Sequence, residues 1–284
     1  MKCSLILATL GRDKELLALL GSLQRQSHKD FELIVIDQNK DSKIDSILAQ
    51  FAGFFPLRHV KVEFTGLARA RDHGIRFASG KIVAFPDDDC VYEDDVLERV
   101  VAEFHRQKGL AILVVGSYDF SKTKFSQGVN CHKPCYFSKF RMMGVEFTQF
   151  FNLDIIKPQQ FYLDHDFGIG SKYGGAEGFE LLYRLLRARN KAFYTPHIRI
   201  YHADKDSYAT GSARILRHSE GIGAYIRKFT KESDPFMLYY FFRKMLVAPV
   251  VKMVMAAFML DSRRFTYSLH NLVGVWRGFC SYGR

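Results

Sequence analysis

The chain has 284 residues, of which 48% are apolar and 25% are charged. This composition excludes a disordered chain and provides a core for one large domain, or for one domain with an appendage. The formal net charge is +11, and residues 181–284 carry 18 Lys or Arg against 6 Asp or Glu. A basic last third favours a localised anionic partner, such as a membrane surface, over nucleic acid.

Up to residue 116, short apolar runs alternate with stretches in which apolar residues recur at helical spacing. The predicted strands span residues 3–8, 31–37, 57–64, 81–86 and 110–116. The predicted helices span residues 13–25, 41–51, 67–78 and 93–107. This alternation is typical of βαβ units around a parallel sheet.

The rest of the chain is less regular. Residues 119–150 have no clean period, and we expect loops or an antiparallel excursion there. The pattern predicts a helix at 179–189, a last strand at 192–202 and a further helix at 211–230.

A strongly apolar stretch follows at residues 236–260. Arg243, Lys244, Pro249 and Lys252 interrupt it, so it lacks the run of about 18 apolar residues that a simple membrane span requires. Apolar residues with cations nearby fit helices that lie in the interface of an anionic membrane. Burial in the protein core is the alternative.

The compartment is indicated by the five cysteines, an odd and scattered set that does not resemble a disulfide framework. We therefore expect a reducing cytosol. The short apolar run after Met1-Lys2 is soon interrupted by charges, which indicates a first strand and not a signal peptide.

Three adjacent carboxylates, Asp87, Asp88 and Asp89, directly follow the strand predicted at 81–86. They repel one another unless a cation or hydrogen-bond donors neutralise them. Hard divalent ions such as Mg²⁺ or Mn²⁺ prefer oxygen ligands and are commonly shared with substrate phosphates. The residues therefore indicate a metal site, with a solvated acidic turn as the alternative.

Other polar residues are expected near this cluster. Thr9 and Asp37 close two predicted strands, so they would meet the aspartates at one edge of the sheet, where Asp37 could bind a ribose or a base. Arg71 could contact pyrophosphate or the acid cluster. His202 ends the last predicted strand, where it could contact a metal or phosphate. Each also has a structural interpretation, as a turn residue, an exposed arginine or a buried histidine.

A glycine-rich segment opens the helix predicted at 179–189. Glu177 and Glu180 stand three residues apart at its start, where acids also favour the helix dipole. Either of them could instead be a general base beside a substrate hydroxyl.

Together, these motifs resemble the family 2 inverting glycosyltransferases of the GT-A fold, of the type that makes bacterial cell-surface polysaccharides. The resemblance covers about residues 2–205. Its motifs are the opening strand at 4–9, a nucleoside-binding segment at 31–37, the segment 67–80 before a metal site, a DxD motif in 85–89, and an acceptor loop with an acid helix at 167–170 and 175–185.

The resemblance implies an α/β fold with a Rossmann-like, mixed, mostly parallel sheet flanked by helices. Residues 1–205 would form this catalytic domain, and 206–284 a helical, basic and apolar extension that associates with a membrane. It also implies site residues. The nucleotide sugar would contact Thr9, Asp37, Arg71, Asp87 and Asp88, and Mn²⁺ or Mg²⁺ would contact Asp87, Asp89 and His202.

The chain departs from the family at one catalytic position. Members usually have a second acid at the position of Gly178. We therefore assign the base to Glu177, with Glu180 and Asp166 as the other candidates.

The expected function is transfer of a sugar from a nucleotide-diphosphate donor to a lipid-linked or polysaccharide acceptor. A UDP-hexose or UDP-N-acetylhexosamine is the expected donor, with dTDP-rhamnose as the alternative. A nucleotidyltransferase would need a glycine-rich loop after the first strand, and only Gly11 is found there. A non-catalytic basic module that binds a membrane or nucleic acid would leave the three aspartates unexplained. We expect a cytoplasmic protein attached peripherally to the inner face of the cell membrane.

Overall fold

The computed structural model describes residues 1–203 and 211–283, which form two compact units. The first unit consists of residues 1–65, 69–163 and 181–203. The second contains residues 66–68, 164–180 and 211–283. The domain boundary predicted at residues 205–206 lies outside the described residues. The second unit also includes residues 164–180, which the sequence analysis placed in the first domain.

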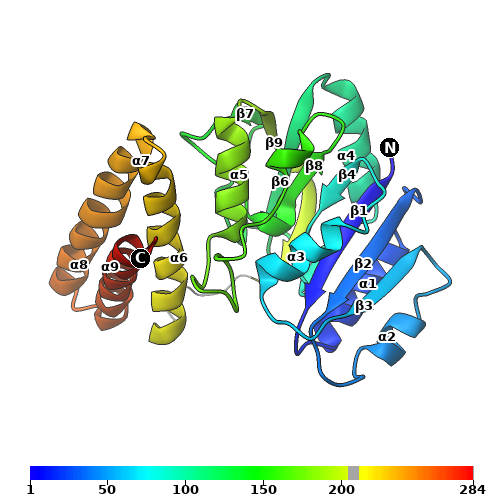
Figure 1. Ribbon diagram of the computed structural model, residues 1–284, viewed down its shortest axis with the longest axis horizontal. Helices are drawn as coiled ribbons and strands as arrows, with labels where there is room; N and C mark the ends of the chain where they lie inside the picture. Colours follow the sequence, from blue (N-terminus) through cyan, green and yellow to red (C-terminus); the bar gives the residue numbers. More distant parts are fainter. Residues whose placement is uncertain (204–210, 284) are drawn as a thin grey trace. The chain divides into compact units, whose positions relative to one another are not determined.

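A nine-stranded, mixed sheet forms the centre of the first unit (Figure 1). Its strands are β1 (Cys3–Thr9), β2 (Phe31–Asp37), β3 (Leu57–Lys61), β4 (Ile82–Ala84), β5 (Cys90–Tyr92), β6 (Leu110–Tyr118), β7 (Cys135–Phe137), β8 (Gln149–Asn152) and β9 (Lys191–His202). The strand order is β3-β2-β1-β4-β8-β6-β9-β5, and β7 also pairs with β9. The first four of these strands in the order are parallel. β8 is antiparallel to both β4 and β6.

Helices cover both faces of this sheet. They are α1 (Lys14–Gln24), α2 (Asp45–Ala49), α3 (Leu67–Ile75), α4 (Val96–Arg106) and α5 (Glu177–Arg187). Apolar residues of α1 and α4 share one buried cluster with Leu5 and Leu7 of β1. Ile6 points to the opposite face, because successive side chains of a strand alternate. There it meets Gly74 of α3.

The predicted alternation of strands and helices up to residue 116 is confirmed, although α2 and β4 are shorter than predicted. The expected antiparallel excursion after residue 119 is also present, as β7 and β8. The sequence analysis missed β5, whose three residues directly follow the aspartates. This short strand pairs with the end of β9 and so brings His202 beside Cys90.

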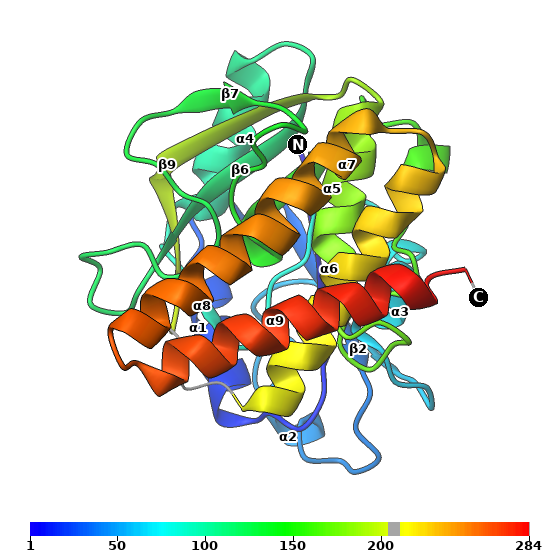
Figure 2. The ribbon, with the colours of Figure 1, turned by 90° about the vertical axis from the view of Figure 1, so that its left-hand side faces the viewer.

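Helices make up most of the second unit. After α6 (Ser212–Lys231) come α7 (Pro235–Tyr240), the π-helical segment η4 (Phe241–Val247), α8 (Ala248–Phe258) and α9 (Ser262–Ser281). Figure 2 shows α7, η4 and α8 along one line, with α9 returning across α6. The backbones of α6 and α9 approach closely at Gly223 and Gly278, where added Cβ atoms would lie 2.0 Å and 1.9 Å from carbonyl oxygens of the facing helix. Among the described residues, no helix combines the length and the apolarity that crossing a membrane requires.

Gly74 provides a test of how closely α3 packs on the sheet. A Cβ at this position would lie 2.3 Å from Cγ2 of the buried Ile6. We predict that Gly74→Ala destabilises the protein by about 1–3 kcal/mol in urea unfolding, although alanine favours helices. Gly53→Ala is the control, since a Cβ there meets nothing within 4 Å. Equal stability of the two variants would contradict the packing argument.

Candidate functional site

The polar residues that end β1, β2 and β4 lie at one edge of the sheet. Thr9 and Asp37 are paired in the register of β1 and β2. The Thr9 hydroxyl donates a hydrogen bond to Asp88 Oδ2 over 2.9 Å. The sheet thus brings Thr9, Asp37 and the aspartates together, because the carboxyl ends of parallel strands meet at the same edge.

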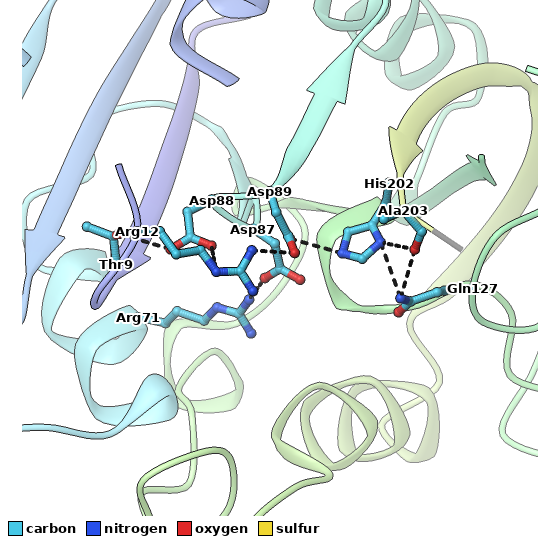
Figure 3. Close-up of polar contacts among 9 residues, drawn as sticks. All are labelled: Thr9, Arg12, Arg71, Asp87, Asp88, Asp89, Gln127, His202 and Ala203. Atoms are coloured by element: carbon cyan, nitrogen blue, oxygen red, sulfur yellow. Dashed lines mark hydrogen bonds and ion pairs between the residues drawn. The ribbon is translucent and has the colours of Figure 1, made fainter. Parts of the chain in front are cut away.

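The three adjacent carboxylates are contacted by Arg71, Arg12 and His202, which come from three separate segments of the chain (Figure 3). Arg71 Nη2 of α3 lies 2.6 Å from Asp87 Oδ1. Arg12, in the turn after β1, lies 3.3 Å from Asp88 Oδ1 through its Nε and also forms an ion pair with Asp89. The mutual repulsion of the aspartates is therefore offset by groups from three separate segments of the chain.

Asp88 has a proton affinity above the ordinary value for an aspartate. Burial raises its pKa to about 6, and the charges of Asp87 and Asp89 act in the same direction. The guanidinium of Arg12 and the hydroxyl of Thr9 oppose this rise. Three carboxylates and two arginines meet at this edge, a balance that favours a further cation.

His202 faces the cluster from the end of β9, with its side chain only 2% exposed. Its Nε2 lies 2.9 Å from Asp89 Oδ1. Its Nδ1 lies 2.8 Å from the Ala203 carbonyl oxygen and 3.2 Å from Gln127 Nε2. Because a carbonyl only accepts, Nδ1 carries a hydrogen in the shorter contact, and a neutral ring then presents a lone pair at Nε2. Two electron-rich atoms face each other there, an arrangement that a proton or a metal ion between them stabilises.

Asp87, Asp89 and His202 fit a divalent cation. One ligand atom of each lies within 4.8 Å of the others. Two carboxylate oxygens with one imidazole nitrogen suit Mn²⁺, and an oxygen-rich set that leaves positions for substrate phosphate also suits Mg²⁺. All three predicted metal ligands are therefore close enough to share an ion.

A second polar group lies around Asp37, which is completely buried. Its Oδ2 lies 2.9 Å from His59 Nε2 of β3, and its Oδ1 accepts hydrogen bonds from the backbone and side-chain nitrogens of Asn39. Asn39 Oδ1 in turn accepts from the Gly11 amide. Asp37 thus orients the side chains of Asn39 and His59, which are more exposed than its own, at the edge of the sheet. Asp45 joins Asp37 and His59 within metal-ligand distance, but Lys61 Nζ lies 2.8 Å from its carboxylate.

The predicted candidates for the base belong to the second unit, and they differ in their surroundings. Glu177, at the start of α5, is 7% exposed. Its carboxylate packs against Gly168. The φ of Gly168 is +99°, a backbone conformation that residues other than glycine rarely adopt. Asp166 is exposed. Glu180 is completely buried, and its Oε1 lies 2.8 Å from Lys228 Nζ of α6.

Lys228 also contacts Asp164, at 2.8 Å. Burial by itself would lower the pKa of Lys228, but the carboxylates of Glu180 and Asp164 outweigh burial and raise it. Glu180 therefore faces a charged ammonium throughout the neutral pH range. The ion pair therefore holds the Glu180 carboxylate toward Lys228.

The sequence analysis missed several residues of these clusters. Arg12 lies in the turn that follows Thr9 and β1. A cation in a turn at the carboxyl end of a strand is a signal that could have identified it. His59 lies on β3, which two strands separate from β4 and the aspartates, and its partner is Asp37. Gln127 lies in a segment without a period, and Lys228 is one of several cations on α6. No sequence pattern distinguishes either of them.

Comparison with known proteins identifies related sequences. The profile described as Glycosyl transferase family 2 matches residues 4–207. An uncharacterized glycosyltransferase of Bacillus subtilis, YfnE, is 29% identical over 114 residues, which are 39% of this chain and 29% of that protein. An uncharacterized glycosyltransferase of Rickettsia felis is 30% identical over 97 residues, 34% of this chain and 16% of that protein. The matches thus span less than a third of either relative.

Solved structures with a similar fold include two glycosyltransferases. The mannosyltransferase PcManGT of Pyrobaculum calidifontis, in complex with GDP-Man and Mn²⁺, has a TM-score of 0.71 at 14% identity, over 97% of this chain and 86% of that chain. TarS 1–349 of S. aureus, in complex with UDP-GlcNAc, has a TM-score of 0.61 at 14% identity, over 95% of this chain and 90% of that chain. At these identities, the likeness establishes the GT-A type of fold.

The metal-ligand geometry leads to a binding test. We predict that Asp89→Asn weakens Mn²⁺ binding about tenfold or more, measured by the paramagnetic resonance signal of free Mn²⁺, because it removes a charged oxygen ligand. The matched control is Asp94→Asn, since the Asp94 side chain is 64% exposed and pairs with Arg25. Mn²⁺ affinity that is equal in wild type and Asp89→Asn would refute the assignment.

Proposed function

Because the chain belongs to glycosyl transferase family 2, we propose that it transfers a sugar with inversion from a nucleotide-diphosphate donor to a lipid-linked or polysaccharide acceptor. One observation carries the proposal: two carboxylates and an imidazole converge at the carboxyl end of the sheet, within ligand distance of one another. Family membership also favours glycosyl transfer over the nucleotidyl transfer that the sequence analysis left open.

The donor diphosphate binds at the Asp87–Asp89 cluster in this proposal. Asp87, Asp89 and His202 would hold Mn²⁺ or Mg²⁺, which would supply positive charge to the departing diphosphate. The two arginines of the cluster have different roles. Arg12, whose side chain is 34% exposed, is the better placed for contact with a ligand, while Arg71, at 2% exposed, holds Asp87 in position.

The nucleoside lies, in this proposal, over the ends of β1, β2 and β3. Thr9 and Asp37 were predicted to contact it. Since Asp37 is buried, it acts through Asn39 and His59, whose polar groups it holds in place. A UDP-hexose or UDP-N-acetylhexosamine is the proposed donor, with dTDP-rhamnose as the alternative. The nucleotide-sugar complexes of two proteins with a similar fold support this class of donor.

Glu177 is the proposed base. The acceptor hydroxyl attacks the anomeric carbon, the bond from that carbon to the diphosphate oxygen breaks, and Glu177 takes the hydroxyl proton. The electron pair of the broken bond leaves with the nucleoside diphosphate. We prefer Glu177 because the ion pair with Lys228 holds the Glu180 carboxylate and because Asp166 is exposed.

Donor hydrolysis tests the proposed function without knowledge of the acceptor. We predict slow release of nucleoside diphosphate from at least one of UDP-glucose, UDP-N-acetylglucosamine, dTDP-rhamnose and GDP-mannose in the presence of Mn²⁺. EDTA and Asp89→Ala should each abolish the release, because both remove the cation that stabilises the leaving diphosphate. Release that continues in EDTA, or no release from any donor, would oppose the proposal.

Two conservative substitutions distinguish the candidate bases. We predict that Glu177→Gln lowers kcat about a hundredfold or more with little change in donor affinity, the result expected for a lost general base. Glu180→Gln removes the charge from one partner of a largely buried ammonium, and we predict a loss of about 1–3 kcal/mol of stability. Turnover and thermal unfolding are measured for both variants. If Glu180→Gln lost its turnover but kept its stability, while Glu177→Gln stayed active, Glu180 would be the base.

A further inference from the structure

The turn between α8 and α9 presents three consecutive apolar side chains to solvent. Phe258 is 87% exposed, Met259 64% and Leu260 92%. We call these three residues the apolar tip; it joins the two helices that face the viewer in Figure 2. Leu260 also has a φ of +54°, a left-handed conformation in which glycine or asparagine usually ends a helix. Leucine is unfavourable in this backbone conformation, and its exposed side chain buries no apolar area within the unit. The residue therefore does not contribute to the stability of its own unit.

The apolar surface continues from the tip along one face of α8. Val250, Val251, Val254 and Met255 are each about half exposed, at 46–55%. With Phe258, they recur at the spacing of a single helical face. We call them the α8 face. Pro249 and Ala256, seven residues apart, are buried on the opposite side. The exposed residues therefore do not form the interior of their own unit.

The charge around this apolar surface is almost entirely positive. Residues 235–284 contain seven Lys or Arg and a single acid, Asp261. Asp261 caps α9 and forms an ion pair with Arg264 at 3.1 Å, so its charge is already compensated. Lys252 and Arg263, on either side of the tip in the sequence, are exposed. The natural partner of such a surface combines apolar material with negative charge.

The composition of these helices indicates contact with a surface, not a span. Among the described residues, no helix is both long and apolar enough to cross a membrane. Cations within the apolar stretch, such as Lys252, would be costly in the hydrocarbon core. Helices with one apolar face and flanking cations lie in the interfacial region, with the apolar side chains below the headgroups. A second copy of the chain fits less well, because two equally basic surfaces would repel each other.

We propose that the apolar tip and the α8 face dock on the surface of an anionic phospholipid bilayer. Phe258, Met259 and Leu260 insert below the headgroups, and Lys252 and Arg263 contact the lipid phosphates. The chain would then lie at the cytoplasmic face of the cell membrane, beside the lipid-linked acceptor of the proposed function. Attachment is a property of this surface alone, so its test needs neither donor nor turnover. Its failure would leave the proposed sugar transfer untouched.

The test measures flotation of the full chain with vesicles of phosphatidylcholine, with or without phosphatidylglycerol. We expect binding to the anionic vesicles that is at least tenfold stronger than to the neutral ones and that weakens with salt. The double variant Phe258→Gln, Leu260→Asn should bind anionic vesicles at least tenfold more weakly. It should also unfold at the same temperature as wild type or higher, since asparagine suits the conformation of residue 260. Lys252→Glu with Arg263→Glu should remove the preference for anionic lipid.

The matched control replaces two exposed phenylalanines of the first unit, Phe120→Gln with Phe140→Gln, which are 54% and 65% exposed. Its flotation should equal that of wild type. Point variants are preferable to deleting residues 235–284, because deletion removes α9 and exposes the face of α6 against which it packs.

Three results would overturn the proposal. The full chain could fail to float with anionic vesicles at low salt. The Phe258 and Leu260 variant could float as well as wild type. The wild type could sediment as a dimer that the same variant dissociates while vesicle binding is unchanged, which would assign the surface to a second copy of the chain.

Discussion

The first unit depends on the neutralisation of three adjacent carboxylates at the end of β4. Asp87, Asp88 and Asp89 would repel one another if they stood alone, and burial of Asp88 adds to that cost. Their partners come from separate parts of the chain: Arg12 after β1, Arg71 from α3 and His202 from β9. The cluster therefore forms only when these elements are assembled. The same concentration of charge makes the edge of the sheet suitable for a divalent cation and a diphosphate.

A different ion-pair arrangement organises the acids of the second unit. Lys228 of α6 joins Asp164 and Glu180, so it ties α6 to the glycine-rich segment and to the start of α5. Two acids at the start of one helix thereby acquire different properties. Glu180 serves the structure as the partner of an ammonium, while the carboxylate of Glu177 lies against Gly168. Environment, and not residue type, separates the candidate bases.

The helices of the second unit have two apolar surfaces of different kinds. One packs inside the unit, where glycines let α6 and α9 approach until added Cβ atoms would collide with backbone oxygens. The other, formed by the apolar tip and the α8 face, meets solvent in the described structure. α8 itself has both kinds of face, because Pro249 and Ala256 are buried on the side opposite to the exposed α8 face.

Apolar periodicity predicted the strands and helices up to residue 116 apart from β5, because it reports which face of each element is buried. The sequence also predicted that Thr9, Asp37 and Asp87–Asp89 meet at one edge, since the ends of parallel strands coincide. The pairing of each carboxylate with its cation depends instead on the tertiary fold. Arg12 and His202 are far from the aspartates in sequence, and no local pattern encodes such a pairing. The tertiary fold likewise decided that Glu180 is held by Lys228, and which side of α8 faces solvent. Those outcomes depend on how helices pack on one another, a property of contacts between distant segments.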